Sequence, residues 1–280
     1  MGLIIHHGSP HWWLSPDIWV TPDGATSTSP PGVLNPTAGE LYDVWCRVWN
    51  PTSTAITDWN LTILWAIPTA GAIPLTATHP LDESGVGSVA GGGFKIIKAQ
   101  TKWRPVFENG GHECLIAFTN WSGIVFPLQP SLDGDEAPGN TASIAQHNLG
   151  VVLLKKHPKF HYAFQVCNSA PEERSFVVAA RQAPLSEVEG FMAGLPGDRK
   201  ANEKPGKVQS LGLVASAQPD PSELKTAKPV LERVKVGPRS CRGFSLVGSL
   251  DAGTALIHVT QTIDERIVGG LSVLVLSDGS

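Results

Sequence analysis

The sequence is a succession of short β-type segments separated by turn-forming residues. Runs rich in Val, Ile, Thr and Trp alternate with clusters of Gly, Pro, Asn and Ser throughout the 280 residues, a pattern that is typical of strands and turns. In residues 42–49, Val44, Cys46 and Val48 share one face of a predicted strand. The 29 glycines and 23 prolines follow no fixed period, so a collagen-like chain is excluded. The pattern predicts an all-β fold.

The two halves of the chain differ in composition. All nine tryptophans lie between Trp12 and Trp121, and a segment rich in Asp, Gly and Pro follows at residues 127–140. At roughly 100–150 residues per domain, the length allows two domains. We place the boundary near residue 135, which predicts a Trp-rich domain with an N-terminal arm at residues 1–135 and a second domain at residues 136–280.

Residues 183–229 interrupt the strand rhythm of the second half with Gly, Pro, Lys and Glu. This segment is too long for an ordinary hairpin connection. Ser186 and Glu189 have the spacing of a capping box ahead of Phe191 and Met192, so one short helix is predicted there. We interpret the segment as a partly helical insertion whose remaining loop is mobile or is ordered by a partner.

Four cysteines, Cys46, Cys114, Cys167 and Cys241, are divided equally between the halves. They permit three pairings, of which Cys46 with Cys114 and Cys167 with Cys241 keep each disulfide within one domain. The order Cys46, Trp59, Cys114 is also that of immunoglobulin domains, in which a Trp packs against two facing cysteines. The oxidation state stays open, because a buried free thiol also packs as a small hydrophobic residue.

Three histidines near the N-terminus, His6, His7 and His11, are weak candidates for metal ligands. Neutral imidazoles at such spacing bind zinc or copper when a fourth ligand folds beside them. No carboxylate or cysteine stands at matching spacing in that segment, so the alternative is an ordered arm whose imidazoles bond to backbone carbonyls. We therefore expect no metal and no cofactor.

Charge and motifs exclude several classes of function. The net charge is −4, and Lys and Arg form no run with interleaved aromatic residues, which argues against nucleic-acid binding. No run approaches the roughly 20 apolar residues of a membrane-spanning helix, and the N-terminus lacks the features of a classical signal peptide. The sequence contains no nucleophile elbow, no His-Glu-x-x-His helix and no Walker loop, so we do not expect an enzyme.

Five blocks of the chain, taken in order, resemble the CARDB-type β-sandwich modules of bacterial immunoglobulin-like proteins. They are residues 15–20 (SPDIWV), 44–50 (VWCRVWN), 64–66 (LWA), 111–117 (GHECLIA) and 144–149 (IAQHNL). The resemblance covers most of residues 10–155, and the later half is similar in a looser way. It implies two tandem immunoglobulin-like β-sandwich domains that serve adhesion, scaffolding or ligand binding in larger surface or secreted proteins. It carries no catalytic residue to this chain.

We expect a non-enzymatic structural or interaction protein, namely a self-assembling or particle-associated β-sandwich subunit that forms homo-oligomers or larger assemblies with protein partners. The expected contact residues lie in the arm and the insertion and are His11, Trp12, Trp13, Trp19, Phe191 and Met192.

The arm tryptophans also allow two other interpretations, core packing or an exposed platform for glycan, which would make the chain a carbohydrate-binding module. A metal-dependent hydrolase that uses the N-terminal histidines is a third alternative. An extracellular, cell-surface or particle-associated location is favoured despite the missing signal peptide.

Overall fold

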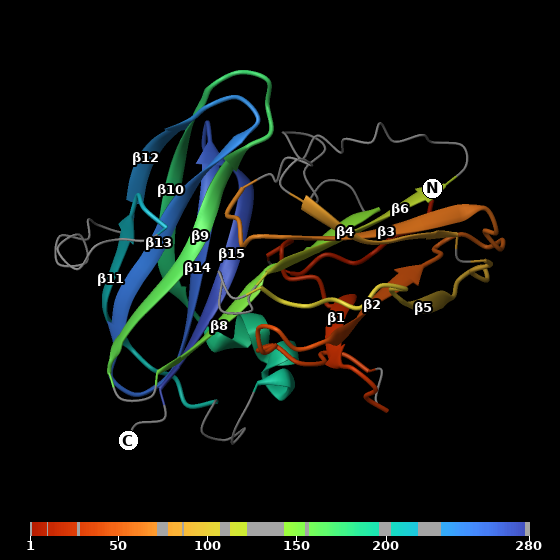
Figure 1. The fold of residues 1–280 in the computed structure, drawn as a ribbon, viewed down its shortest axis with the longest axis horizontal. Coiled ribbons are helices and arrows are strands. Elements are labelled where there is room, and N and C mark those ends of the chain that lie inside the picture. The colour runs from red at the N-terminus through yellow and green to blue at the C-terminus, as the bar shows by residue number, and fades with distance from the viewer. Residues whose placement is uncertain are drawn as a thin grey trace.

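The computed structural model describes residues 2–9, 11–26, 29–71, 78–85, 87–106, 113–121, 143–154, 157–195, 203–217 and 231–277. Within these ranges the named elements are fifteen strands and one 3-10 helix, η5. The all-β prediction is therefore confirmed. The strands form four sheets, and Figure 1 shows the sheets of β1–β7 on one side of the molecule and those of β8–β15 on the other.

Two antiparallel sheets share a core in the first half of the chain. The smaller has the order β1-β2-β5, with strands Ile18–Pro22, Tyr42–Trp49 and Phe94–Lys98. The larger has the order β4-β3-β6-β7, with strands Thr78–Gly85, Trp59–Ala66, Cys114–Trp121 and Ile144–His147. Val44, Cys46 and Val48 of β2 point into this core with Leu61 and Ile63 of β3, as their alternation predicts.

Two further sheets enclose a second core. One has the order β12-β10-β14-β15-β8, with strands Leu231–Val236, Arg174–Ala183, Gly253–Ile263, Arg266–Ser277 and Leu149–Leu154. The other has the order β11-β13-β9, with strands Val208–Val214, Ser240–Leu250 and Lys159–Asn168. Strands β15 and β8 run parallel, and the other neighbours are antiparallel. Phe164 and Phe244 pack together in this core.

The first-half sheets extend beyond the predicted domain boundary. Strand β7 begins at Ile144 and pairs with β6, Ala145 lying opposite Ala117. The boundary near residue 135 itself lies outside the described residues. Strand β7 ends at His147 and β8 begins at Leu149. A single residue, Asn148, therefore separates a strand of the first-half sheets from a strand of the second-half sheets.

Asn148 is also a contact between the two groups of sheets. Its side-chain Nδ2 donates to the carbonyl of Thr69 at 2.8 Å and to that of Gly270 at 2.9 Å. Close by, a Cβ atom on Gly269 would lie 2.2 Å from the carbonyl oxygen of Ala70. A side chain cannot fit there, so glycine is needed for this close approach of two backbones. The halves of the chain are joined by direct packing at this point.

The predicted insertion at residues 183–229 contains regular structure. Helix η5 (Leu185–Gly194) is a kinked 3-10 helix, and its N-cap is Pro184 with no side-chain cap. The predicted capping box is wrong, because Ser186 lies inside the helix and not at its cap. Strand β11 then pairs with β13, while residues 196–202 and 218–230 lie outside the described residues. No helix in the described part of the chain has the length and apolarity needed to cross a membrane.

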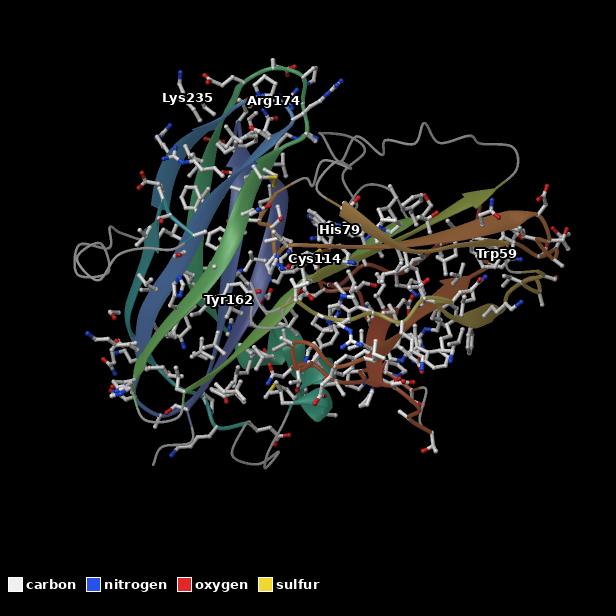
Figure 2. All side chains as sticks on the ribbon, viewed as in Figure 1. Trp59, His79, Cys114, Tyr162, Arg174 and Lys235 are labelled. Carbon is white, nitrogen blue, oxygen red and sulfur yellow. A yellow bond between two sulfur atoms is a disulfide. The ribbon has the colours of Figure 1, made fainter. Side chains whose placement is uncertain are left out.

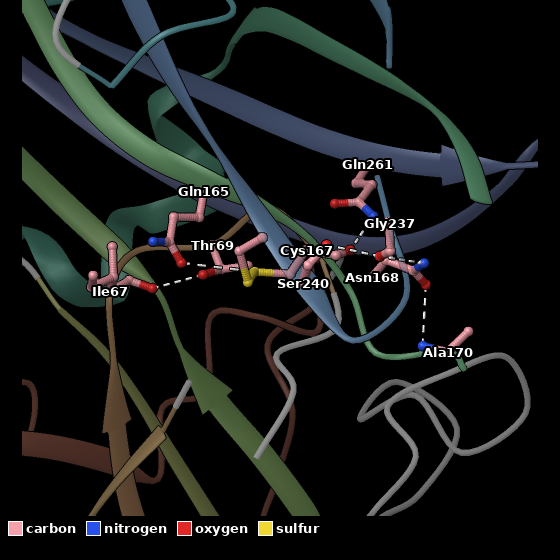
Figure 3. Close-up of a disulfide and its surroundings, with 10 residues drawn as sticks. Ile67, Thr69, Gln165, Cys167, Asn168, Ala170, Gly237, Ser240 and Gln261 are labelled. Atoms are coloured by element: carbon pink, nitrogen blue, oxygen red, sulfur yellow. Dashed lines mark hydrogen bonds between the residues drawn. A yellow bond between two sulfur atoms is a disulfide. The ribbon is translucent and has the colours of Figure 1, made fainter. Parts of the chain in front are cut away.

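One of the two considered disulfides forms. Cys167 and Cys241 face each other on β9 and β13 and are bonded, as Figure 3 shows. Cys46 and Cys114 are buried free thiols. Cys46 points into the core between the first two sheets, whereas Cys114 belongs to a separate cluster on the other face of its sheet. Figure 2 places Trp59 and Cys114 far apart along the first-half sheets. The predicted Cys–Trp–Cys arrangement is therefore wrong.

Candidate functional site

Most of the predicted contact residues meet inside the molecule. Trp13 and Met192 are only 1% and 4% exposed, and they share one apolar cluster with the partly buried Trp12 and Phe191. We call this cluster, which includes residues of β8, β14 and β15, the arm junction. Trp19 lies apart from it and is also buried. The interpretation of Trp13 and Trp19 as part of an exposed glycan platform is therefore wrong, because both indoles are buried away from solvent.

A polar group adjoins the arm junction. The Nε2 atoms of His11 and His258 lie 2.6 and 2.8 Å from the same oxygen, Oε2 of Glu187. His11 belongs to the arm, Glu187 to η5 and His258 to β14. The two imidazole centroids are 3.9 Å apart. We call these three residues the His–Glu–His cluster.

Glu187 fixes the proton position on His258, and a hydrogen-bond chain through Ser272 reaches Trp13. The indole Nε1 of Trp13 donates to Ser272 Oγ at 2.9 Å, and this hydroxyl lies 2.8 Å from His258 Nδ1. An ionised carboxylate can only accept, so an uncharged His258 carries its proton on Nε2, facing Glu187. Its Nδ1 then accepts the hydroxyl proton of Ser272, whose oxygen accepts the indole N–H of Trp13. A continuous chain of hydrogen bonds thus runs from Trp13 to the Glu187 carboxylate.

Burial sets the charges of the cluster. It lowers the pKa of His258 to about 4, and the hydrogen bond with Glu187 opposes this shift only in part. Burial acts to raise the pKa of Glu187, but hydrogen bonds from His258 and His11 outweigh it, and the net pKa lies below the usual value of a glutamate. At neutral pH the cluster therefore contains an uncharged His258 and an ionised Glu187.

The other N-terminal histidines do not join His11. Nδ1 of His6 lies 2.9 Å from Oδ2 of Asp17, which is 0% exposed and also bonds Arg47. Among the described residues, the His–Glu–His cluster is the group of three side chains with the spacing of metal ligands, and it contains neither His6 nor His7. The three weak candidates His6, His7 and His11 therefore do not form one group of potential metal ligands.

The outer face of the β1-β2-β5 sheet is a second candidate site. On β5, Phe94 and Ile96 are 53% and 38% exposed. The register places them opposite Trp49 and Arg47 of β2. The Arg47 guanidinium lies 5.1 Å from the centroid of the Trp49 ring, within the range of a cation–π contact. We call this surface the aromatic face; it comprises Trp45, Arg47, Trp49, Phe94, Ile96 and Lys98.

Asp17 fixes the central side chains of the aromatic face. Its Oδ1 accepts a hydrogen bond from Arg47 Nε at 2.6 Å, and its Oδ2 accepts one from Trp49 Nε1 at 2.8 Å. At the neighbouring position, Trp45 Nε1 donates to Thr21 Oγ1 at 2.9 Å. These bonds hold a guanidinium and two indoles in one orientation before any partner binds, which reduces the entropy that binding would cost.

A groove beside β3 and β4 contains a stacked aromatic pair. The rings of Trp65 and His79 are 4.2 Å apart with an interplanar angle of 20°. The groove has a volume of about 890 Å³. It is lined by Ala38, Gly39, Trp65, Ile67, His79, Arg104, Pro105 and Val106. An aromatic ring beside an arginine in a concave site is suited to a small polar ligand.

Three unpaired polar atoms belong to residues around one small cavity. They are Trp19 Nε1, Trp103 Nε1 and Glu113 Oε2, which have no hydrogen-bond partner among the residues that the structure describes. The cavity has a volume of about 20 Å³ and is also lined by His147, which is enough space for one water molecule with polar partners. Burial raises the pKa of Glu113 to about 7, although the backbone N–H of Val106 bonds its other oxygen and acts in the opposite direction.

Two residues of the His–Glu–His cluster, Glu187 and His258, were not predicted from the sequence. Glu187 stands between Ser186 and Glu189 of the predicted capping box, and nothing in its local sequence marks it as a metal ligand. His258 interrupts the otherwise apolar run Ala255, Leu256, Ile257 and Val259. A histidine inside such a run must find a polar partner when the strand is buried. Its position in this apolar run is the one sequence feature that indicates a buried polar site there.

Comparisons with known proteins leave the family open. No protein-family model matches the chain, and no curated protein is similar to it in sequence. Red sea bream transglutaminase is similar in structure over 94% of this chain and 31% of its own, with 11% identity and a TM-score of 0.24. Escherichia coli alpha-2-macroglobulin activated by porcine elastase matches 93% of this chain and 22% of its own, with 8% identity and a TM-score of 0.26.

The enterotoxigenic E. coli CFA/I adhesin CfaE matches over 99% of this chain and 91% of its own, with 7% identity and a TM-score of 0.22. The chain thus spans about a third of the transglutaminase and about a fifth of the macroglobulin. At these TM-scores the similarities support no conclusion about activity.

Proposed function

We propose that the protein is a non-enzymatic structural subunit of two tandem immunoglobulin-like β-sandwiches that assembles with copies of itself through the aromatic face. The observation that carries this proposal is the exposure of Phe94 and Ile96 side by side with the half-buried Trp49. Contiguous exposed apolar surface with a polar rim is typical of protein contact sites, and Trp and Arg are enriched among the residues that dominate binding energy.

The backbone of β5 supports the same proposal. Among the described strands, β5 lies at the edge of its sheet and pairs with β2 alone. The unpaired N–H and C=O groups of an edge strand bind a further strand from another chain. The aromatic face therefore adjoins a strand edge, with which a strand of another chain can pair.

The order of side chains on β5 suits pairing with a second copy. In an antiparallel pair of two β5 strands centred on Ile96, Phe94 of one copy would lie opposite Lys98 of the other. Ile96 would lie opposite Ile96, and Lys95 opposite Ile97. The pairing brings an aromatic ring to a cation and places no two lysines directly opposite each other. A two-fold symmetric contact of this kind is the commonest arrangement of homodimers.

Light scattering behind size exclusion, at several protein concentrations, tests the proposal. We expect the wild-type mass to exceed the monomer mass of 29.7 kDa and to rise with concentration. The variant Ile96→Lys should return the mass to that of the monomer, because it places two lysines directly opposite each other at the centre of the paired strands. Ile267→Lys is the matched control, since Ile267 is 49% exposed on β15 and lies outside the aromatic face.

Two results would contradict the proposal. One is a wild-type protein that stays monomeric at every concentration. The other is an Ile96→Lys variant with native circular dichroism and an unchanged oligomeric mass, which would move the contact elsewhere on the molecule.

A carbohydrate-binding module is the second candidate function, and the groove of Trp65 and His79 favours it. Arg104 offers a donor to sugar hydroxyls at the wall of this groove. Binding to an array of soluble oligosaccharides tests this candidate. Trp65→Ala should abolish any binding in the groove, whereas Trp45→Ala on the aromatic face should leave it unchanged.

The disulfide supports an extracellular or cell-surface location as part of this proposal. Cys167 and Cys241 are separated by 74 residues in sequence, and disulfides of this kind persist in oxidising compartments. Assembly through a sheet face also fits the adhesion or scaffolding role that the resemblance to CARDB-type modules implies.

A further inference from the structure

We propose that the His–Glu–His cluster is a binding site for a divalent transition metal of the zinc class. Three potential ligand atoms, Nε2 of His11, Nε2 of His258 and a carboxylate oxygen of Glu187, all lie within 4.8 Å of one another. Two imidazoles and one carboxylate are a common set of protein ligands for zinc. This inference is independent of the aromatic face.

The directions of the side chains support a metal ion over an incidental contact. Both imidazoles point Nε2 at the same carboxylate oxygen, at 2.6 and 2.8 Å. Two ligands of one zinc ion, each about 2.0–2.2 Å from it, lie roughly 3–4 Å apart. Movements of less than about 1 Å would therefore place all three atoms around one ion.

An outer layer of hydrogen bonds already orients one ligand. His258 Nδ1 lies 2.8 Å from Ser272 Oγ, which in turn accepts the indole N–H of Trp13. When a metal binds Nε2, the proton of His258 moves to Nδ1 and the hydroxyl becomes its acceptor. The two lone pairs of Ser272 Oγ suffice for both donors. Fixing the second imidazole nitrogen in this way is typical of metal-bound histidines.

The ion would connect three segments that are distant in sequence. His11 lies in the arm, Glu187 in η5 and His258 in β14. Because the side chain of Glu187 is 19% exposed and that of His11 is 11% exposed, the site is within reach of solvent. Three protein ligands leave a fourth position for water. The metal would fix the arm in the arm junction.

Zinc binding by the full-length protein tests the proposal. After removal of metals with EDTA, calorimetric titration should show one zinc site per chain, and elemental analysis of the reloaded protein should find one zinc per chain. Addition of Co²⁺ to the metal-free protein should give the visible absorption of tetrahedral cobalt. Glu187→Gln keeps the size of the side chain and an acceptor for both histidines, and it should weaken zinc binding at least tenfold, because even changes to outer-layer partners cost about 10–100-fold. Glu189→Gln, an exposed position of the same helix, is the matched control.

His11→Ala provides a second variant. Because His11 lies at the rim of the cluster, its loss should leave the circular dichroism spectrum unchanged. It should still weaken zinc binding at least tenfold. Zinc binding that is unaffected by both variants would overturn the proposal, as would the absence of stoichiometric zinc. The cluster would then be a hydrogen-bonded contact between the arm, η5 and β14.

Discussion

The indole N–H of Trp13 donates to the hydroxyl of Ser272 at 2.9 Å across 259 positions of sequence. Both residues are buried, and the same hydroxyl donates to His258. The bond thus connects the arm to β15 and to the His–Glu–His cluster. A residue near the start of the chain is therefore part of the architecture of the second-half sheets.

Substitution of Ser272 tests the importance of this connection. Ser272→Ala leaves the Trp13 N–H and the His258 Nδ1 without their partner, and we expect the free energy of unfolding to fall by roughly 1–3 kcal/mol, the cost of unsatisfied buried polar groups. Urea denaturation measures the change. Ser210→Ala, at an exposed serine, should change it by less than about 0.5 kcal/mol. Equal effects of the two substitutions would show that the buried bond contributes nothing.

Deletion of residues 1–14 should unfold the protein. The arm was expected to supply contact residues for assembly, but Leu3, Ile5, Trp13 and Leu14 are all buried. Truncating one large core side chain costs about 2–5 kcal/mol, and a domain has only about 5–15 kcal/mol of stability. Loss of the sharp thermal transition in circular dichroism is the expected result. A cooperative transition at the wild-type temperature would contradict it.

Gly270→Ala should destabilise the arm junction. A Cβ atom at this position would lie 2.5 Å from the ring of Trp13, so the indole would have to move away from Ser272. We expect a loss of about 1–3 kcal/mol, as for other overpacked cores. Gly190→Ala, where nothing lies within 4 Å of the added atom, is the control in the same urea experiment. Equal stabilities of the two variants would show that the indole adapts without cost.

Glu113 should make the protein less stable as the pH rises from about 4.5 to about 7. Its folded-state pKa of about 7 lies above the ordinary value of 4.5, so in this window the folded protein retains a proton that the unfolded chain has lost. The stability lost between pKa 4.5 and about 7 is roughly 3 kcal/mol at 1.36 kcal/mol per pKa unit, and the loss is complete above the folded pKa.

Urea denaturation between pH 4 and 8 measures this dependence. Glu113→Gln should be more stable than the wild type above pH 7, and the difference should shrink towards pH 4.5. Glu189→Gln should follow the wild-type profile. Parallel profiles for the wild type and Glu113→Gln would remove Glu113 as the cause.

The strands were predictable where one face of the sheet lies in a core. The alternation of Val44, Cys46 and Val48 identifies β2, because each of these side chains points between the two sheets. The other face of β2 carries the large side chains Trp45, Arg47 and Trp49 of the aromatic face. Helix η5 was expected near its observed position, but local capping chemistry could not predict its 3-10 geometry or its start after Pro184.

The candidate sites were less predictable because they depend on pairing between distant segments. His11 was singled out, yet its partners Glu187 and His258 stand in other elements, and no spacing in the sequence connects them. The pairing of the cysteines was equally hard to predict from sequence spacing. Their order matched an immunoglobulin pattern, but the pairing of Cys46 with Cys114 fails because the two side chains belong to clusters on different faces of a sheet.

The burial of Trp13 against Gly270 and Ser272 has a consequence for synthesis. Trp13 leaves the ribosome long before β15 has been translated, so its indole lacks this partner while most of the chain is made. Contacts between such distant positions form slowly, and exposed apolar segments favour aggregation until they form. Trp13 is translated early and yet is among the last core residues to reach its final packing.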